Sequence, residues 1–236
     1  YQELGKTKDE LSMLQHVAYA KKSLCDSDGS ISAYKQALSM AKTRGDVGVQ
    51  KKVLWELRKL ESSIGNVKLA QAYAVSLDSL SEITSDLQVK YEYYNQKGSE
   101  ARQNGQYGIA EQWYFRGKEI AEKGVTKTVS ADKHQSYVNL QNMYAATGRY
   151  DEALLYARKA INMYQAYTPK NDATYNMPYM ALADIYRLKG DKENCYSSLV
   201  MLFNGLANIK NPKDLYALYT TRGRCRFAFE DYQAAL

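Results

Sequence analysis

One short motif returns along the whole chain at nearly constant intervals. It consists of glycine, a variable residue, tyrosine and, three residues later, alanine, and it occurs at residues 105–110 and 148–153. Altered copies begin near residues 29, 65, 190 and 230, so the intervals are 36, 40, 43, 42 and 40 residues. A repeat of this length is typical of proteins that stack one supersecondary unit many times. The chain is therefore predicted to be a solenoid.

The residues around each motif are spaced for two helices. Before Gly148, the side chains of Tyr137, Leu140 and Tyr144 recur at i, i+3 and i+7, which places them on one face of a helix. Apolar residues continue at helical spacing over residues 153–164. Glycine tolerates a positive φ at a helix end, and only 3 prolines occur in 236 residues. Each repeat is thus predicted to be a hairpin of two antiparallel helices.

Side-chain size within the motif predicts how the hairpins pack. Small residues allow two helices to approach closely, whereas aromatic rings fill the space up to the next hairpin. The chain has 22 tyrosines, and we expect half-buried rings whose hydroxyl groups reach water. The expected close-contact alanines are Ala110, Ala153 and Ala160, and the expected gap-filling tyrosines are Tyr107, Tyr150 and Tyr232.

The fourth repeat resembles the tetratricopeptide repeat. Its residues read Tyr137-x2-Leu140-Gln141-x2-Tyr144, followed by Gly148, Tyr150, Ala153 and Ala160, and similar segments begin at Tyr179 and Tyr219. The resemblance implies an all-α fold, a right-handed α-solenoid of antiparallel helix hairpins that forms a single domain over residues 1–236. Residues 1–49 are expected to be a degenerate first repeat, and the last repeat is expected to be truncated at Leu236.

The repeats depart from the family in length. A tetratricopeptide unit has about 34 residues, whereas most intervals here are 40 or more. Residues 167–172 and 210–213 are the expected extra links, each with a proline just past a helix end. Such elongated repeats resemble those of bacterial sensor and regulator proteins. By this analogy the chain belongs to a larger regulator, and a periplasmic location is favoured over a cytoplasmic one.

The family resemblance also implies a function. The expected role is that of a scaffold or sensor module that binds a protein or peptide in its concave groove. The alternative is a substrate-recognition platform for an enzyme, a kinase or protease, whose catalytic domain is missing here. The chain itself is not expected to be an enzyme, because it has neither a phosphate-binding P-loop nor a G-x-S-x-G nucleophile motif.

The resemblance places certain side chains on the groove side of the first helix of each hairpin. One subgroup of the family binds C-terminal carboxylates there with lysines and asparagines, but only Asn142 matches and the lysines are missing, so that clamp is rejected. Trp55, Trp113, Met177 and Met180 are either apolar anchors or, the preferred interpretation, ordinary helix packing. The predicted groove residues are Asn95, Ser99, Arg102, Asn142, Met180, Asp184, Arg187 and Arg224.

Residues that bind metals or cofactors are sparse. The 3 cysteines include no C-x-x-C pair and are expected to be small buried thiols. His16 and His134 lie in different repeats without nearby ligands, so both are expected to be exposed or to cap helices, and no metal site is predicted. No cofactor is predicted either.

The remaining partner classes are judged from charge and hydropathy. The net charge of +6 is dispersed, and its one dense cluster is Arg222, Arg224 and Arg226, so nucleic acid ranks below protein as a partner. No apolar run approaches the roughly 20 residues of a membrane span. The uncapped ends of a solenoid can pair, which allows an end-to-end homo-oligomer.

Overall fold

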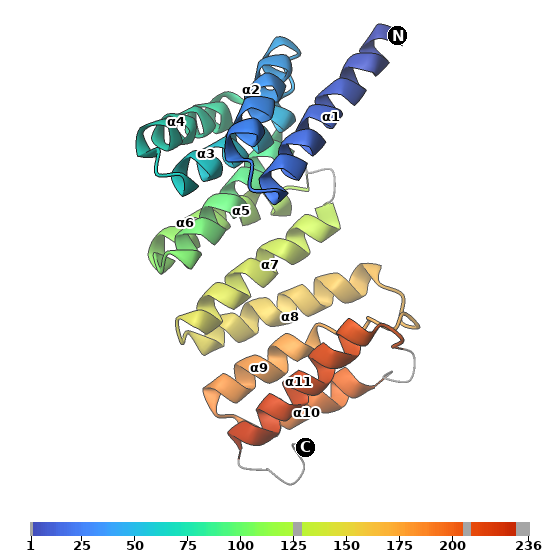
Figure 1. The fold of residues 1–236 in the computed structure, drawn as a ribbon. Helices are drawn as coiled ribbons and strands as arrows, with labels where there is room; N and C mark the ends of the chain where they lie inside the picture. The colour runs from blue at the N-terminus through green and yellow to red at the C-terminus, as the bar shows by residue number, and fades with distance from the viewer. Residues whose placement is uncertain (1, 125–128, 205–208, 230–236) are drawn as a thin grey trace. The chain divides into compact units, whose positions relative to one another are not determined.

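The chain folds entirely into helices over the residues that the structure, a computed structural model, describes (Figure 1). These are residues 2–124, 129–204 and 209–229. They form eleven α-helices and no strand. The helices are α1 (Gln2–Ser23), α2 (Ser27–Thr43), α3 (Val47–Ser63), α4 (Val67–Ile83), α5 (Leu87–Gln103), α6 (Tyr107–Glu122), α7 (Val129–Ala146), α8 (Tyr150–Tyr167), α9 (Tyr179–Lys189), α10 (Lys192–Phe203) and α11 (Pro212–Ala228).

The helices belong to two compact units, residues 1–93 and residues 94–236. In the first unit α1 packs on α2, α2 on α3 and α3 on α4. In the second, α7 packs on α8 and α9 on α10, while α11 contacts both α9 and α10. The predicted fold class, an all-α solenoid of helical hairpins, is confirmed. That a single solenoid runs from residue 1 to residue 236, with a degenerate repeat at 1–49, stays a prediction.

A glycine in the left-handed region closes the predicted turn of the fourth hairpin. Gly148 has φ +74°. The following backbone N–H, that of Arg149, donates to the Tyr144 carbonyl at 3.0 Å, which is the long hydrogen bond of a Schellman motif. The same glycine conformation and hydrogen bond recur after α3, α5 and α9, with glycines at positions 65, 105 and 190. The motif glycines at positions 65, 105, 148 and 190 therefore end the first helices of their hairpins, as predicted.

We expect Gly148→Ala to lower the free energy of unfolding by about 1 kcal/mol, because a Cβ is strained at this positive φ. No neighbouring atom would touch that Cβ, so the cost is conformational rather than steric. Gly108→Ala is the control, since Gly108 lies inside α6 with open space around it. It should leave stability unchanged or raise it in urea denaturation, and an equal loss in both variants would contradict the turn assignment.

The first turn differs from the sequence expectation. It lies at residues 24–26, where Cys25 has φ 60°, while Gly29 is inside α2. A Cβ on Gly29 would lie 2.1 Å from the Asp26 carboxylate, which caps α2 by accepting from the Gly29 N–H at 2.8 Å. Glycine at position 29 thus makes room for the cap. Cys25 is exposed, so the expectation of three buried thiols was wrong for it.

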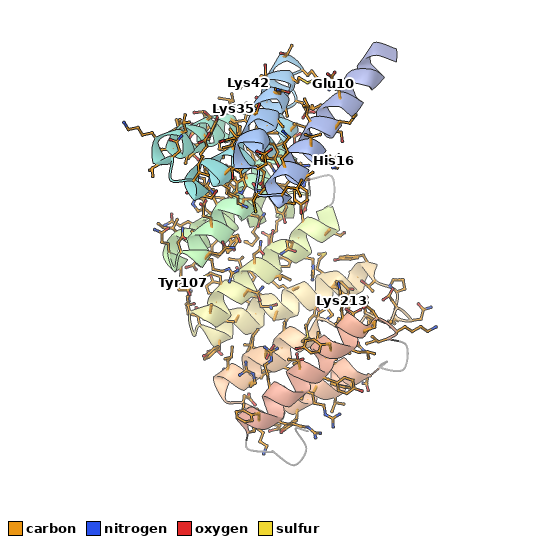
Figure 2. The ribbon with its side chains drawn as sticks, viewed as in Figure 1. Glu10, His16, Lys35, Lys42, Tyr107 and Lys213 are labelled. Atoms are coloured by element: carbon orange, nitrogen blue, oxygen red, sulfur yellow. The ribbon has the colours of Figure 1, made fainter. Side chains whose placement is uncertain are left out.

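Alanines and tyrosines of the motif take different positions. Ala110, Ala153 and Ala160 are buried as predicted. Tyr150 packs partly buried against the core of the second unit. Tyr107 begins α6 and is 37% exposed, so it fills no gap (Figure 2). The sixth copy of the motif, near residue 230 and including Tyr232, lies outside the described residues.

Two tyrosine hydroxyls of α7 bind carboxylates of α6, a pairing that the sequence pattern did not predict. Tyr144 donates to Glu111 at 2.5 Å, and Tyr137 donates to Glu122 at 3.0 Å. Burial, reinforced by the Glu122 carboxylate, raises the pKa of Tyr137 to about 12. The rings of both tyrosines pack on Tyr156 with centroids 5.7 and 6.2 Å away. These contacts connect α6, α7 and α8.

The two proline-containing links differ in their relation to the helices. Pro169 follows the end of α8, as predicted. Pro212 instead opens α11, where the missing N–H costs nothing, and the Asn211 side chain caps the helix by accepting from the Lys213 N–H at 3.0 Å. Among the helices described, none has the length and apolar character needed to cross a membrane.

Candidate binding groove

Two adjoining pockets lie between the first helices of the fourth and fifth hairpins. Each has a volume of about 350 Å³. Both are bordered by Gln141 and Asn142 of α7 and by Met180 and Ala181 of α9, so they are continuous. We call the combined depression the α7–α9 groove. Its two halves differ in chemistry.

The first half, the apolar pocket, is lined mainly by hydrocarbon, aromatic and thioether groups. Its α7 wall follows the helical period, because His134, Val138 and Gln141 recur at i, i+4 and i+7. The second helix of the hairpin and the segment before α9 complete it. Besides the four shared residues, the lining consists of His134, Val138, Ala157, Ala160, Tyr164, Met177 and Pro178.

His134 is a component of this pocket that sequence reasoning missed. Its ring lies 5.3 Å from the Tyr164 ring and 6.5 Å from the Tyr167 ring, centroid to centroid. Burial lowers the pKa of His134 below its usual 6.5, so the imidazole is neutral at pH 7. The expectation that it is exposed or caps a helix was therefore wrong. Its i, i+4 relation to Val138 was the available signal.

The second half, the polar pocket, is built around one carboxylate and two guanidinium groups. Asp184 Oδ1 accepts from Arg187 Nε at 3.2 Å, and Asp184 Oδ2 accepts from an Arg224 terminal nitrogen at 2.8 Å. The side chains are 25%, 21% and 51% exposed for Asp184, Arg187 and Arg224. These three are the only ionisable residues in its lining within the described chain. The pocket therefore carries one net positive charge.

Repeat register explains why these side chains meet. Asn142, Asp184 and Arg224 are separated by 42 and 40 residues, which is the repeat interval, so they hold equivalent positions on α7, α9 and α11. Stacked repeats place equivalent positions of successive units next to one another. The ion pair between Asp184 and Arg224 shows this directly across two first helices.

Five of the eight predicted groove residues line the α7–α9 groove. They are Asn142, Met180, Asp184, Arg187 and Arg224. The other three, Asn95, Ser99 and Arg102, lie on α5 and do not border it. Asn95 is engaged in helix packing, because its Oδ1 accepts from the Asn139 amide at 2.7 Å.

The other candidate residues divide between packing and the groove. Trp55 is buried with the Arg58 guanidinium 4.5 Å from its ring centroid, and Trp113 stacks on Tyr94 at 5.6 Å. Trp113 of α6 therefore packs against α5, and Trp55 is part of the buried core of the first unit. Met177 borders the groove, as does Met180.

The three clustered arginines point to different surroundings. Arg224 pairs with Asp184 in the polar pocket. Arg222 lies 5.8 Å from the Phe203 ring centroid, and it lines, with Arg226, a separate pocket between α10 and α11. The sequence cluster is thus divided between two sides of α11. Across the described chain, no group of three metal-binding side chains comes together.

Comparison with known proteins supports the repeat assignment. Residues 136–170 match the model of the tetratricopeptide repeat family. The crystal structure of BtubC (BKLC) from P. vanneervenii is similar to this chain with a TM-score of 0.69 and 15% identity, covering 91% of this chain and 86% of that one. The crystal structure of the tetratricopeptide-like repeats of a protein assigned as a kinesin light chain from Podosopora anserina is similar with a TM-score of 0.61 and 14% identity. That match covers 84% of this chain and 96% of that one. Among curated protein sequences there is no match.

These similarities establish the repeat type and the fold. At 14–15% identity the two structures show the fold alone. Tetratricopeptide repeats indicate a protein-interaction scaffold in general, and their fold is typically non-catalytic. The chain therefore contains a tetratricopeptide repeat at residues 136–170 and has the all-helical fold of tetratricopeptide-like repeat proteins.

Proposed function

We propose that this chain is a protein- or peptide-binding scaffold within a larger regulatory protein, and that its ligand binds in the α7–α9 groove. The observation that carries the proposal is the convergence of Asn142, Asp184 and Arg224 from three successive first helices beside an apolar pocket. Ligand sites commonly combine an apolar cavity with a few convergent polar groups that fix orientation.

The groove retains hydrogen-bond donors for a ligand. The Asn142 amide oxygen accepts from Gln141 at 3.3 Å, while its amide nitrogen has no acceptor among the described residues. The terminal nitrogens of Arg187 likewise have no acceptor there, because only its Nε contacts Asp184. Such groups can bind the carbonyl oxygens or acidic side chains of an extended peptide.

Filling the groove should abolish ligand binding without unfolding the protein. Ala181 borders both pockets, so we expect the ring of Ala181→Phe to occupy the space that a ligand needs. The matched control is Ala166→Phe, which adds the same ring at an exposed position of α8 outside the groove. Thermal melting followed by circular dichroism should give similar Tm values for both variants.

The readout is quantitative capture of proteins from a lysate of the source organism, compared between the two variants by mass spectrometry. A protein that binds wild type and Ala166→Phe, but is depleted at least tenfold with Ala181→Phe, is the expected result. Equal capture by all three forms would show that the groove is not the binding site.

A further inference from the structure

The polar pocket has an imbalance of charge that defines one feature of its ligand. Both oxygens of Asp184 are already used, one by Arg187 and one by Arg224. Two guanidinium groups face one carboxylate, and in the described chain no other acid borders the pocket. Arg187 and Asp184 are about three-quarters buried, so salt screens their charges less than it would on an open surface.

The internal ion pairs show that this geometry suits a carboxylate. The two guanidinium groups converge on Asp184 from α9 and α11, and the 2.8 Å contact with Arg224 has the length of a charge-assisted hydrogen bond, while the 3.2 Å contact with Arg187 is longer. A guanidinium offers five N–H donors in a planar fork, and most of those on Arg187 and Arg224 have no acceptor within the described residues. A second carboxylate, supplied by a ligand, would neutralise the remaining positive charge.

The apolar pocket defines a second feature. Neutral His134, Val138 and Met177 offer no charged group, and methionine adapts its shape to irregular apolar side chains. A charged side chain there would lose its hydration without a partner, whereas a large apolar one would gain from burial. This half of the groove therefore suits an apolar anchor.

The distance between the two halves gives the spacing of the two features. On α9 both halves meet at Met180 and Ala181, Asp184 lies four residues after Met180, and Arg187 lies six residues after Ala181. At roughly 1.5 Å per residue, the two features are therefore about 6–9 Å apart. An extended chain rises about 3.3 Å per residue and directs alternate side chains to the same face. Residues i and i+2 of an extended segment match this separation.

We infer that the α7–α9 groove binds an extended peptide segment in which an aspartate or glutamate side chain lies two residues from a large apolar side chain. The acid pairs with Arg187 and Arg224, and the apolar side chain enters the pocket beside His134. The inference rests on the proposed function and adds the chemistry of the partner.

The test uses end-blocked, fluorescein-labelled peptides with the sequence Leu-Ser-Glu in a background of glycine and serine. Matched peptides replace the glutamate by glutamine, the leucine by serine, or both, and fluorescence anisotropy measures each Kd. We expect the glutamate-to-glutamine change to weaken binding about tenfold at low salt, the effect of losing a hydrogen-bonded charge. We expect the leucine-to-serine change to weaken it by a similar factor.

Two variants of the protein are expected to change its affinity for the acidic peptide in opposite directions. Arg224→Gln should weaken binding of the acidic peptide, whereas Asp184→Asn should strengthen it, because the competing internal carboxylate is removed. For both variants the change in Kd should be larger for the glutamate peptide than for the glutamine peptide, because only the former brings a carboxylate to the pocket. The control Lys213→Gln removes the same charge at the exposed beginning of α11, where Lys213 lines neither pocket, and should have no effect (Figure 2).

Other outcomes would overturn this inference, and they can be told apart from failure of the proposed function. Equal affinity for the glutamate and glutamine peptides would exclude the acidic contact, even if Ala181→Phe abolished both. Tight binding of a peptide that has a free C-terminal carboxylate but no glutamate would assign the contact to a chain terminus. If no peptide binds while Ala181→Phe still removes a captured protein, the groove is a binding site for a different chemistry.

Discussion

Leu140→Ala is expected to lower the free energy of unfolding by about 3 kcal/mol. Leu140 lies in the middle of α7 with 0% exposure, inside the core of the second unit that α7, α8 and α9 share. Truncation removes buried methyl groups and leaves a cavity that densely packed neighbours such as Met143 and Ala157 fill only in part. Urea denaturation followed by far-UV circular dichroism measures the loss.

The control for this variant is Leu155→Ala in the adjacent helix of the same hairpin. Leu155 is 51% exposed, so its truncation removes the same atoms but leaves no enclosed cavity. We expect a loss below about 1 kcal/mol. Losses of equal size in the two variants would contradict the assignment of Leu140 to the core.

Glu92→Gln is expected to destabilise the first unit by about 1–2 kcal/mol at neutral pH. The Lys51 ammonium is buried, but the Glu92 side chain is 40% exposed, so solvent screens part of their attraction. Lys51 of α3 is only 2% exposed, and its ammonium is paired with the Glu92 carboxylate of α5. Burial lowers the pKa of Lys51, and the hydrogen bond and charge of Glu92 offset part of that shift. Without the carboxylate, the ammonium is buried and lacks this opposite charge.

The pH dependence of this variant follows from the lowered pKa of Lys51. Between its folded pKa and the ordinary value of 10.5, the unfolded chain binds more protons, so stability rises with pH in that interval. Glu92→Gln lowers the folded pKa further, so the interval begins at a lower pH. The deficit relative to wild type should therefore be largest near neutral pH and become smaller toward pH 10.

Two further variants distinguish this electrostatic effect from a loss of packing. Adding Lys51→Met to Glu92→Gln removes the buried charge and should recover most of the lost stability. Glu82→Gln, at an exposed position of α4, changes the same functional group and should cost less than about 0.5 kcal/mol. A deficit that is independent of pH, and persists with Lys51→Met, would contradict the charge explanation.

Local residue patterns predicted the hairpins well because the turns depend on local chemistry. A glycine that follows a helix can adopt positive φ without strain, and this holds at Gly65, Gly105, Gly148 and Gly190. The first turn was not predicted correctly, because Cys25 rather than a glycine takes the left-handed conformation and Asp26 caps the next helix. The exposure of Tyr107 was not predicted, because the motif does not show whether a neighbouring hairpin covers its side chain.

The sequence predicted five of the residues that line the α7–α9 groove. The family resemblance assigned Asn142, Asp184 and Arg224 to the groove side of the first helices. Their spacing of 42 and 40 residues puts them at equivalent positions of stacked units, which lie side by side. The resemblance also selected Asn95, but its amide oxygen accepts from the Asn139 amide in helix packing. His134 was missed, because a histidine with no ligand set gives no signal beyond its helical spacing.

The sequence by itself determined the helical hairpins, their turns and the repeat interval, because these depend on helical periodicity and on glycine conformation within some 40 residues. Only the tertiary structure decided which side chains share an environment. The pairing of Lys51 with Glu92, the shielding of His134 by Tyr164 and the ion pair of Asp184 with Arg224 join different helices. Burial, pKa and net pocket charge arise from these contacts, because each depends on how neighbouring helices exclude water from the groups between them.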